Sequence, residues 1–103
     1  MVEQRKLYEL ISVIARRHGL SVLDPSSRLI LDYIIERESR KISTTARDLI
    51  EETKISRALV YRKLNDLKAQ GWIKEHWVDF KLCYLAGPQS EAIFKALEEA
   101  LPK

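Results

Sequence analysis

The segment that most constrains the fold of this chain is a helix-forming stretch from Ser56 to Gln70. Val60, Leu64 and Leu67 recur in it at helical spacing, which predicts a helix with one buried face. The Ser56 hydroxyl can cap its first turn, and Gly71 can end it because glycine readily adopts a left-handed backbone conformation. A helix of this kind needs neighbouring elements to cover its apolar stripe.

The residues after this helix favour β-structure instead. From Trp72 to Ala86 the composition shifts to tryptophan, isoleucine, valine, phenylalanine, tyrosine and leucine. This pattern predicts a short hairpin that turns near Val78–Asp79, although the turn lacks the Asn-Gly or Asp-Gly pair that favours tight hairpins. Cys83 alternates with apolar neighbours, so we expect it at a buried strand position.

A shorter helix is predicted before the long one, from Ala46 to about Glu52. Ser43, Thr44 and Thr45 supply hydroxyl caps for its start. Only three residues, 53–55, then remain before Ser56. The middle one is Lys54, for which a left-handed conformation costs about 1 kcal/mol.

Three further amphipathic segments flank these elements. Residues 2–18 carry one apolar stripe, and a helix is expected from Pro25, capped by Asp24, to the charged stretch 36–41. A last helix is expected from Ser90 to Leu101, after a break at Gly87-Pro88.

The predicted fold is mainly α with a small β-hairpin, a winged helix-turn-helix with extra terminal helices. We expect one domain over residues 1–103, because a chain of 103 residues has no room for a second. Within it we expect an N-terminal helix at 1–19, a winged-helix core at 24–86 and a C-terminal helix at 89–101.

The run from Ile42 to Ile73 resembles the core of prokaryotic and archaeal winged-helix transcription regulators, including the arsenical-repressor and drug-resistance-regulator groups. The most specific part of the resemblance comprises Ile55-Ser56, Val60-Tyr61-Arg62-Lys63-Leu64, Leu67 and Gly71-Trp72-Ile73. The resemblance implies sequence-specific binding of double-stranded DNA by a homodimer, with residues 56–70 as the recognition helix in the major groove. The chain departs from the family at Lys54, where many relatives have glycine, and at its acidic wing tip.

The residues themselves support a nucleic-acid partner. Between Lys54 and Lys74 six basic side chains stand against one acidic one, a balance of +5, whereas the whole chain has a net charge of +3. Arginine can bind guanine and asparagine can bind adenine, and the first turn of a helix suits a phosphate. The predicted DNA-binding residues are Thr44, Thr45, Arg47, Lys54, Ser56, Arg57, Ala58, Tyr61, Arg62, Asn65, Lys68 and Lys81.

Simpler interpretations stay open for these residues. Charged side chains on a helix usually form a solvated face, and the hydroxyl cluster at residues 43–45 can serve only as a cap. Asp79 at the wing tip disfavours minor-groove contact, and we expect Trp77 and Phe80 to pack on the domain or on a partner. An alternative function is a protein-interaction module without DNA binding, and a third is a regulator that responds to a ligand.

The terminal helices are expected to form a dimer interface, because a winged-helix core is complete without them. The predicted interface residues are Leu7, Leu10, Ile11, Ile14, Ile93, Phe94, Leu97 and Leu101. The other arrangement is a monomer in which both helices fold back on the core.

Other functional classes find little support in the sequence. His18, His76 and Cys83 show no ligand-like spacing, so we expect no metal, no cofactor and no catalytic site. A single cysteine and the lack of a long apolar segment favour a cytoplasmic protein without membrane insertion. Asn65 is the only asparagine, a bias typical of thermophilic, including archaeal, proteins.

Overall fold

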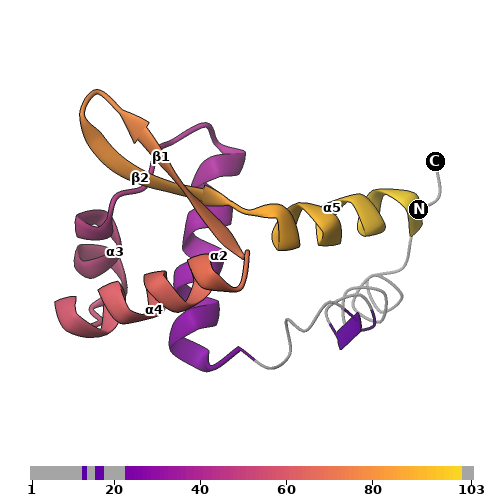
Figure 1. Ribbon diagram of the computed structural model, residues 1–103, viewed down its shortest axis with the longest axis horizontal. Helices are drawn as coiled ribbons and strands as arrows, with labels where there is room; N and C mark the ends of the chain where they lie inside the picture. Colours follow the sequence, from indigo (N-terminus) through magenta and orange to yellow (C-terminus); the bar gives the residue numbers. More distant parts are fainter. Residues whose placement is uncertain (1–12, 14–15, 18–22, 101–103) are drawn as a thin grey trace.

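The computed structural model describes Val13, Arg16, Arg17 and residues 23–100. The elements follow in the order α2 (Pro25–Ser39), α3 (Ala46–Thr53), α4 (Arg57–Ala69), β1 (Ile73–Val78), β2 (Lys81–Ala86) and α5 (Pro88–Ala100). Figure 1 shows α3 and α4 beside α2, with the hairpin above them and α5 extending away on the other side. This is the winged helix-turn-helix that the sequence predicts.

The helices begin where the sequence supplies a cap. Asp24 accepts hydrogen bonds from the Ser27 backbone N–H and hydroxyl at the start of α2. Thr45 and Asp48 form a reciprocal capping box at the start of α3, and Ser56 accepts from the Leu59 N–H at the start of α4. The three predicted core helices are therefore confirmed to within a residue or two.

The last helix begins earlier than predicted, at Pro88 instead of Ser90. Proline is well suited to the first position of a helix, because the N–H that it lacks has no partner there. Gly87 lets the chain enter α5 closely, since a Cβ at this residue would lie 2.5 Å from the carbonyl oxygen of Gly71. The Ser90 hydroxyl donates to the carbonyl of Trp72 and ties α5 to the base of the hairpin.

Three turns of the described chain hold non-glycine residues in the left-handed region, the first of them at Lys41 after α2, with φ of 60°. Lys54 between α3 and α4 has φ of 60°, so this helix-turn-helix keeps the left-handed turn with lysine in place of glycine. Asp79 and Phe80 have φ of 49° and 66° and form the two-residue turn between Val78 and Lys81. Two consecutive left-handed residues define the tight I′ type of hairpin turn, and each costs about 1–2 kcal/mol when it carries a side chain.

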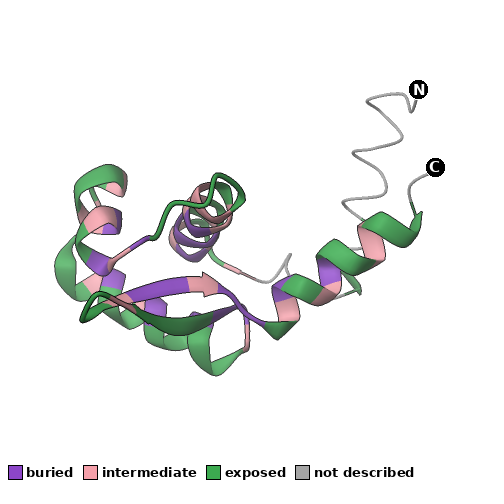
Figure 2. Ribbon diagram, turned by 90° about the horizontal axis from the view of Figure 1, so that it is seen from above, coloured by how far each residue is buried: buried purple, intermediate pink, exposed green. Residues whose placement is uncertain are grey.

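The core lies between α2 and the elements around it. Ile30, Leu31 and Ile34 on one face of α2 pack with buried side chains of α3, α4 and the base of the hairpin. Figure 2 shows these buried faces turned inward, while the hairpin tip and the far half of α5 are exposed. Within the described part of the chain, no helix combines the length and apolarity that crossing a bilayer requires.

Candidate nucleic-acid interface

Helix α4 presents one face to the core and the opposite face to solvent. Val60, Leu64 and Leu67 are buried, which fixes the rotation of the helix. The exposed residues of α4 are Arg57, Ala58, Tyr61, Arg62, Asn65, Asp66, Lys68 and Ala69. The sequence-based prediction of which residues point outward is confirmed.

An open groove runs along this face. A hollow of about 560 Å³ lies between the first turn of α3, Tyr61 of α4 and Lys81 and Leu82 of the wing. A second hollow of about 420 Å³ shares Arg47, Glu51 and Tyr61 with it and reaches Arg57. The guanidinium carbon of Arg57 lies 5.5 Å from the centre of the Tyr61 ring, a cation–π contact within one helical turn. The groove thus joins α3, α4 and the wing into one concave surface.

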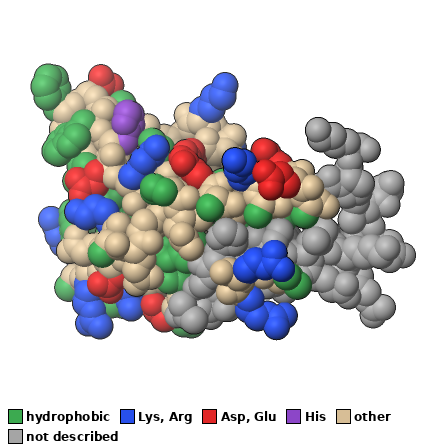
Figure 3. All heavy atoms as spheres, turned by 45° about the vertical axis from the view of Figure 1, so that its right-hand side comes forward, with side chains coloured by type: hydrophobic (Ala, Val, Ile, Leu, Met, Phe, Trp, Pro, Cys, Tyr) green, Lys and Arg blue, Asp and Glu red, His purple; other side chains and the backbone are tan. Residues whose placement is uncertain are grey.

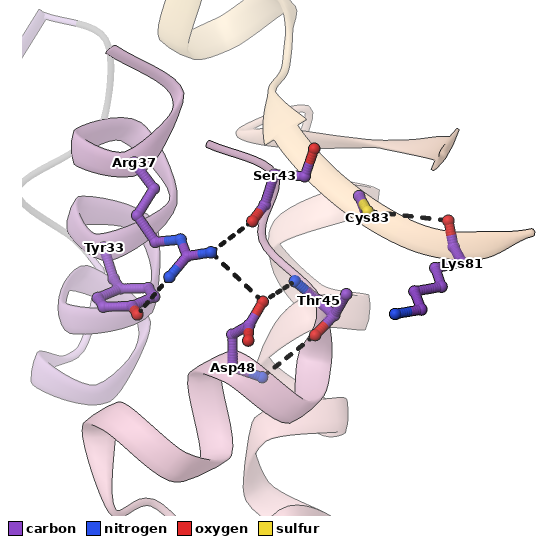
Figure 4. Close-up of polar contacts among 7 residues, drawn as sticks. All are labelled: Tyr33, Arg37, Ser43, Thr45, Asp48, Lys81 and Cys83. Carbon is purple, nitrogen blue, oxygen red and sulfur yellow. Dashed lines mark hydrogen bonds and ion pairs between the residues drawn. The ribbon is translucent and has the colours of Figure 1, made fainter. Parts of the chain in front are cut away.

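Arg37 of α2 holds the first turn of α3 in its place in this surface (Figure 4). Its guanidinium donates to the Ser43 carbonyl at 2.6 Å and to the Tyr33 hydroxyl at 3.0 Å, and lies 3.6 Å from the Asp48 carboxylate. Asp48 in turn accepts from the backbone N–H of Thr45. The side chain of Arg37 is only 22% exposed, so these contacts are screened less than surface ones. Nothing in the local sequence around Arg37 indicates this role.

The base of the wing is fixed to α2 and to the connection before α3. The Glu38 carboxylate accepts from the Ala86 N–H, and the Tyr84 N–H donates to the Thr44 carbonyl. Burial raises the pKa of the Tyr84 phenol above its ordinary value, with smaller contributions from nearby Glu75 and Tyr61, so this group stays neutral. The wing and the helices therefore form one rigid frame.

The structure separates Thr44 from Thr45, two of the predicted DNA contacts. Thr44 is 1% exposed because its backbone pairs with Tyr84, so the prediction that its side chain contacts DNA is wrong for this conformation. Thr45 uses its hydroxyl as the helix cap, which is the simpler of the two interpretations. Its position at the rim of the groove still places the first turn of α3 at the surface.

Three lysines of the basic segment have acidic partners outside it. Lys63 lies 3.2 Å from Asp24, Lys74 lies 3.6 Å from Glu91, and Lys68 donates to Glu75 of β1. The charge count along the sequence therefore overstates the positive charge available to a ligand. Among the residues that the structure describes, no carboxylate forms an ion pair with Arg57, Arg62, Lys54 or Lys81, whereas Arg47 pairs with Glu51 at 3.0 Å.

The wing tip bears on one of the two expected packing sites of its aromatic side chains. Trp77 is 65% exposed and Phe80 is 99% exposed, so neither packs on the described portion of the domain. Cys83 is buried as predicted, and the strand register places His76 directly opposite it. Across residues 23–100 and the three described residues before them, no three histidine, cysteine, aspartate or glutamate side chains gather into a cluster that would hold a metal ion.

Comparison with models of known protein families identifies the family of this chain. The MarR family model matches residues 18–76, which is more than half of the chain. The chain belongs to the MarR family. Membership of this family makes it a DNA-binding transcription regulator, as the resemblance of residues 42–73 implied. Among curated protein sequences the comparison finds no match.

Solved structures share the fold of this MarR-family chain at low sequence identity. TubR of Bacillus thuringiensis, bound to 24 bp of tubC, is 20% identical, with a TM-score of 0.60 over 88% of this chain and 95% of its own. NolR of Sinorhizobium fredii is 23% identical, with a TM-score of 0.57 over 96% and 93%. The oxidized form of MarR from Escherichia coli is 12% identical, with a TM-score of 0.60 over 96% and 74%.

The predicted dimer residues fall into two groups. Ile93 is buried in the core, Leu97 is half-buried, and Phe94 is 38% exposed on α5. The other predicted interface residues, Leu7, Leu10, Ile11, Ile14 and Leu101, lie outside the described residues.

Proposed function

We propose that this regulator binds specific double-stranded DNA sequences by placing α4 in the major groove. The observation that carries the proposal is the exposed face of α4, anchored from behind by Val60, Leu64 and Leu67. Arg57 and Arg62 offer bidentate donors for guanine, and Asn65 offers the amide pair that suits adenine. Because the helix cannot rotate, these side chains meet the duplex in one register.

The groove beside α4 suits the phosphate backbone. The first turn of α3 lines this groove through Ala46 and Arg47, and the first N–H groups of a helix have no partner inside it, although the Thr45 hydroxyl already caps the Asp48 N–H. Lys81 reaches the same groove from the wing, and Lys54 and Ser56 lie at the start of α4. We assign Lys54, Ser56 and Lys81 to phosphate contact, and we leave out Lys68 and Arg47 because the carboxylates of Glu75 and Glu51 already bind them. The DNA-bound TubR structure has this same fold.

We infer that the protein acts as a homodimer that uses α5. Figure 1 shows that α5 extends away from the core, and Phe94 is exposed on it. Burying this helix against a second copy would remove the exposed ring from water and set two α4 helices on one side of the pair. A two-fold dimer of this kind recognises an inverted repeat with half-sites about 34 Å apart, or a multiple of that distance.

The first experiment is selection of bound fragments from random or genomic DNA, followed by titration of the selected duplex. Arg57→Ala and Arg62→Ala should each weaken binding about tenfold or more. Arg40→Ala is the matched control, since Arg40 is an exposed arginine on α2 paired with Glu36, and it should bind like the parent. Parent affinity that falls steeply with salt is also expected. Equal binding by all four proteins would refute the proposed role of α4.

Oligomeric state is tested by sedimentation at several concentrations. The parent should sediment as a dimer and Phe94→Glu as a monomer, because a charge in an apolar interface is costly. A parent that stays monomeric would overturn the homodimer.

We also propose that the protein lies in the cytoplasm. We further propose that it belongs among thermophilic proteins, and an unfolding midpoint above about 90 °C is the measurement that checks this.

A further inference from the structure

The charged surface of this protein is mixed rather than uniformly basic. Figure 3 shows Asp and Glu side chains close to Lys and Arg side chains on the face that it displays. A negative charge that faces phosphates opposes the binding of a duplex. A carboxylate inside the groove that we assign to DNA therefore needs an explanation.

Glu51 of α3 is such a carboxylate. It lines both hollows of the groove, together with Arg47 and Tyr61. The other acid in the first hollow, Asp48, belongs to the frame, because it completes the capping box of α3 and lies 3.6 Å from Arg37. Glu51 is exposed, and among the residues that the structure describes its polar partner is Arg47.

This ion pair leaves part of the carboxylate available. The Nε of Arg47 donates to the Oε1 of Glu51 at 3.0 Å, and Oε2 has no partner within the described part of the chain. An ionised carboxylate accepts hydrogen bonds at both of its oxygens. Exposed pairs four residues apart stabilise a helix only slightly, so helix stability is a weak reason for an acid at this position.

The second hollow places Glu51 near the arginine that we assign to guanine. Its volume is about 420 Å³, and it is lined by Arg47, Ile50, Glu51, Arg57 and Tyr61. Arg57 supplies hydrogen-bond donors, and its guanidinium carbon lies 5.5 Å from the centre of the Tyr61 ring. Glu51 supplies an acceptor in the same hollow. The hollow therefore presents a donor and an acceptor together.

The major-groove edges of the base pairs decide what this combination fits. A G·C pair offers the N7 and O6 acceptors of guanine next to the N4 amino donor of cytosine, which match Arg57 and Glu51 in turn. An A·T pair would set the O4 acceptor of thymine against the carboxylate, and a reversed C·G pair would oppose both side chains. A T·A pair would leave Arg57 with one acceptor instead of two.

We propose that Glu51 is a specificity-determining residue, which accepts a hydrogen bond from the N4 amino group of cytosine in the G·C pair whose guanine Arg57 binds. This inference rests on the proposed function of α4, because α3 meets base edges only when α4 holds the duplex. Glu51 also acts by repulsion, since it lowers the affinity for duplexes that lack the amino group at this position. Helix α3 thus contributes to sequence recognition.

The first test repeats the selection from random-sequence DNA with the parent, Glu51→Gln and Glu52→Gln. Glu51→Gln keeps the shape of the side chain and adds an amide donor that the O4 of thymine can accept. The parent should prefer G·C at the position where Arg57→Ala relaxes the selection, and Glu51→Gln should lower the preference for G·C over A·T there about tenfold.

Glu52→Gln is the matched control for charge. Glu52 is an exposed acid on the same helix, and it lines neither hollow of the groove. Both variants remove one negative charge, so a general gain in affinity for DNA does not affect the ratio between base pairs. Glu52→Gln should therefore keep the base preference of the parent.

A chemically modified duplex isolates the cytosine amino group. N4-methylcytosine still pairs with guanine, but its methyl group replaces the amino hydrogen that faces the major groove. The parent should bind this duplex about tenfold more weakly than the unmodified one, whereas Glu51→Ala should bind the two about equally. As a positive control, 7-deazaguanine in the same pair removes an acceptor for Arg57 and should weaken both proteins alike.

The two proposals fail in different ways. Equal binding of both duplexes by the parent would show that Glu51 does not read cytosine, and the role of α4 would stand. The same conclusion would follow if Glu51→Gln kept the parental preference, or if the selected site had no G·C pair where Arg57 binds. A parent that selects no DNA would overturn both proposals.

Discussion

The helix-turn-helix and the wing tip of this protein differ in where their apolar side chains lie, although Lys54 between α3 and α4 is left-handed like the two residues of the wing turn. In α2 to α4 each helix begins at a capping side chain, each apolar stripe is buried, and Arg37 ties two helices together. At the wing tip two residues adopt a left-handed conformation and two aromatic rings face water. Agreement of local and global preferences is typical of regions selected for stability. Local conflict is typical of regions selected for contact with something else.

The largest difference is expected in truncations of apolar side chains. Ile34→Ala should lower the free energy of unfolding by about 2–5 kcal/mol, because Ile34 is fully buried and its removal leaves a cavity. Trp77→Ala should change it by less than about 0.5 kcal/mol, although it removes the larger side chain. Urea unfolding of both variants measures this. If Trp77→Ala greatly lowered the free energy of unfolding, the wing tip would contribute to the stability of the fold, and the proposed difference between it and the helices would be wrong.

Capping side chains provide the next test. Thr45→Ala should destabilise the protein by about 1 kcal/mol, because it breaks a reciprocal capping box. Ser56→Ala removes one exposed hydrogen bond, to the Leu59 N–H, and should cost less. The same urea titrations compare the two. If Ser56→Ala were the more damaging, the start of α4 and not the start of α3 would be the critical cap.

The parts of the fold that can be predicted from the sequence are those set by residues close to one another in the chain. Asp24-Pro25, Ser56 and Gly71 act on their nearest neighbours, so the bounds of α2 and α4 follow from residues within one helical turn. The predicted start of α5 is two residues late because Pro88 belongs to a residue type that both breaks chains and begins helices. The tight turn is hard to predict at Phe80, where the residue type argues against the conformation that it adopts.

Contacts between distant residues account for what cannot be predicted at the site. Thr44 is buried by pairing with Tyr84, which lies forty residues further along the chain. The carboxylates that pair with Lys63, Lys68 and Lys74 lie outside α4 and the basic segment. A count of charges along the sequence therefore cannot show that these three lysines are already neutralised. The exposed face of α4 is predictable, because one helix's own periodicity determines it.

One substitution at the wing tip should stabilise the protein, whereas most substitutions lower the free energy of unfolding. Phe80→Gly should raise the free energy of unfolding by about 0.5–1 kcal/mol, because relief of the left-handed strain exceeds the added entropy of the unfolded chain. Urea unfolding measures this, with Lys81→Ala as a neighbouring control that leaves the turn unchanged. If Phe80→Gly were less stable than the parent, the ring would contribute to folding, and stability and contact would not conflict at this residue.

The smallest effect is a dependence of stability on pH that belongs to the helix-turn-helix side of the contrast. The hydrogen bond from the Ser27 hydroxyl, aided by Lys63, lowers the pKa of the Asp24 carboxyl from 3.8 to about 2. A lowered pKa means that the ionised group stabilises the folded state above pH 3.8, and that this contribution is lost as the pH falls towards about 2. Asp24→Asn keeps a capping oxygen but cannot titrate, so its stability should fall less steeply in this window. Urea titrations of both proteins between these pH values measure the difference, and parallel curves would show that the cap of α2 holds by geometry and not by charge.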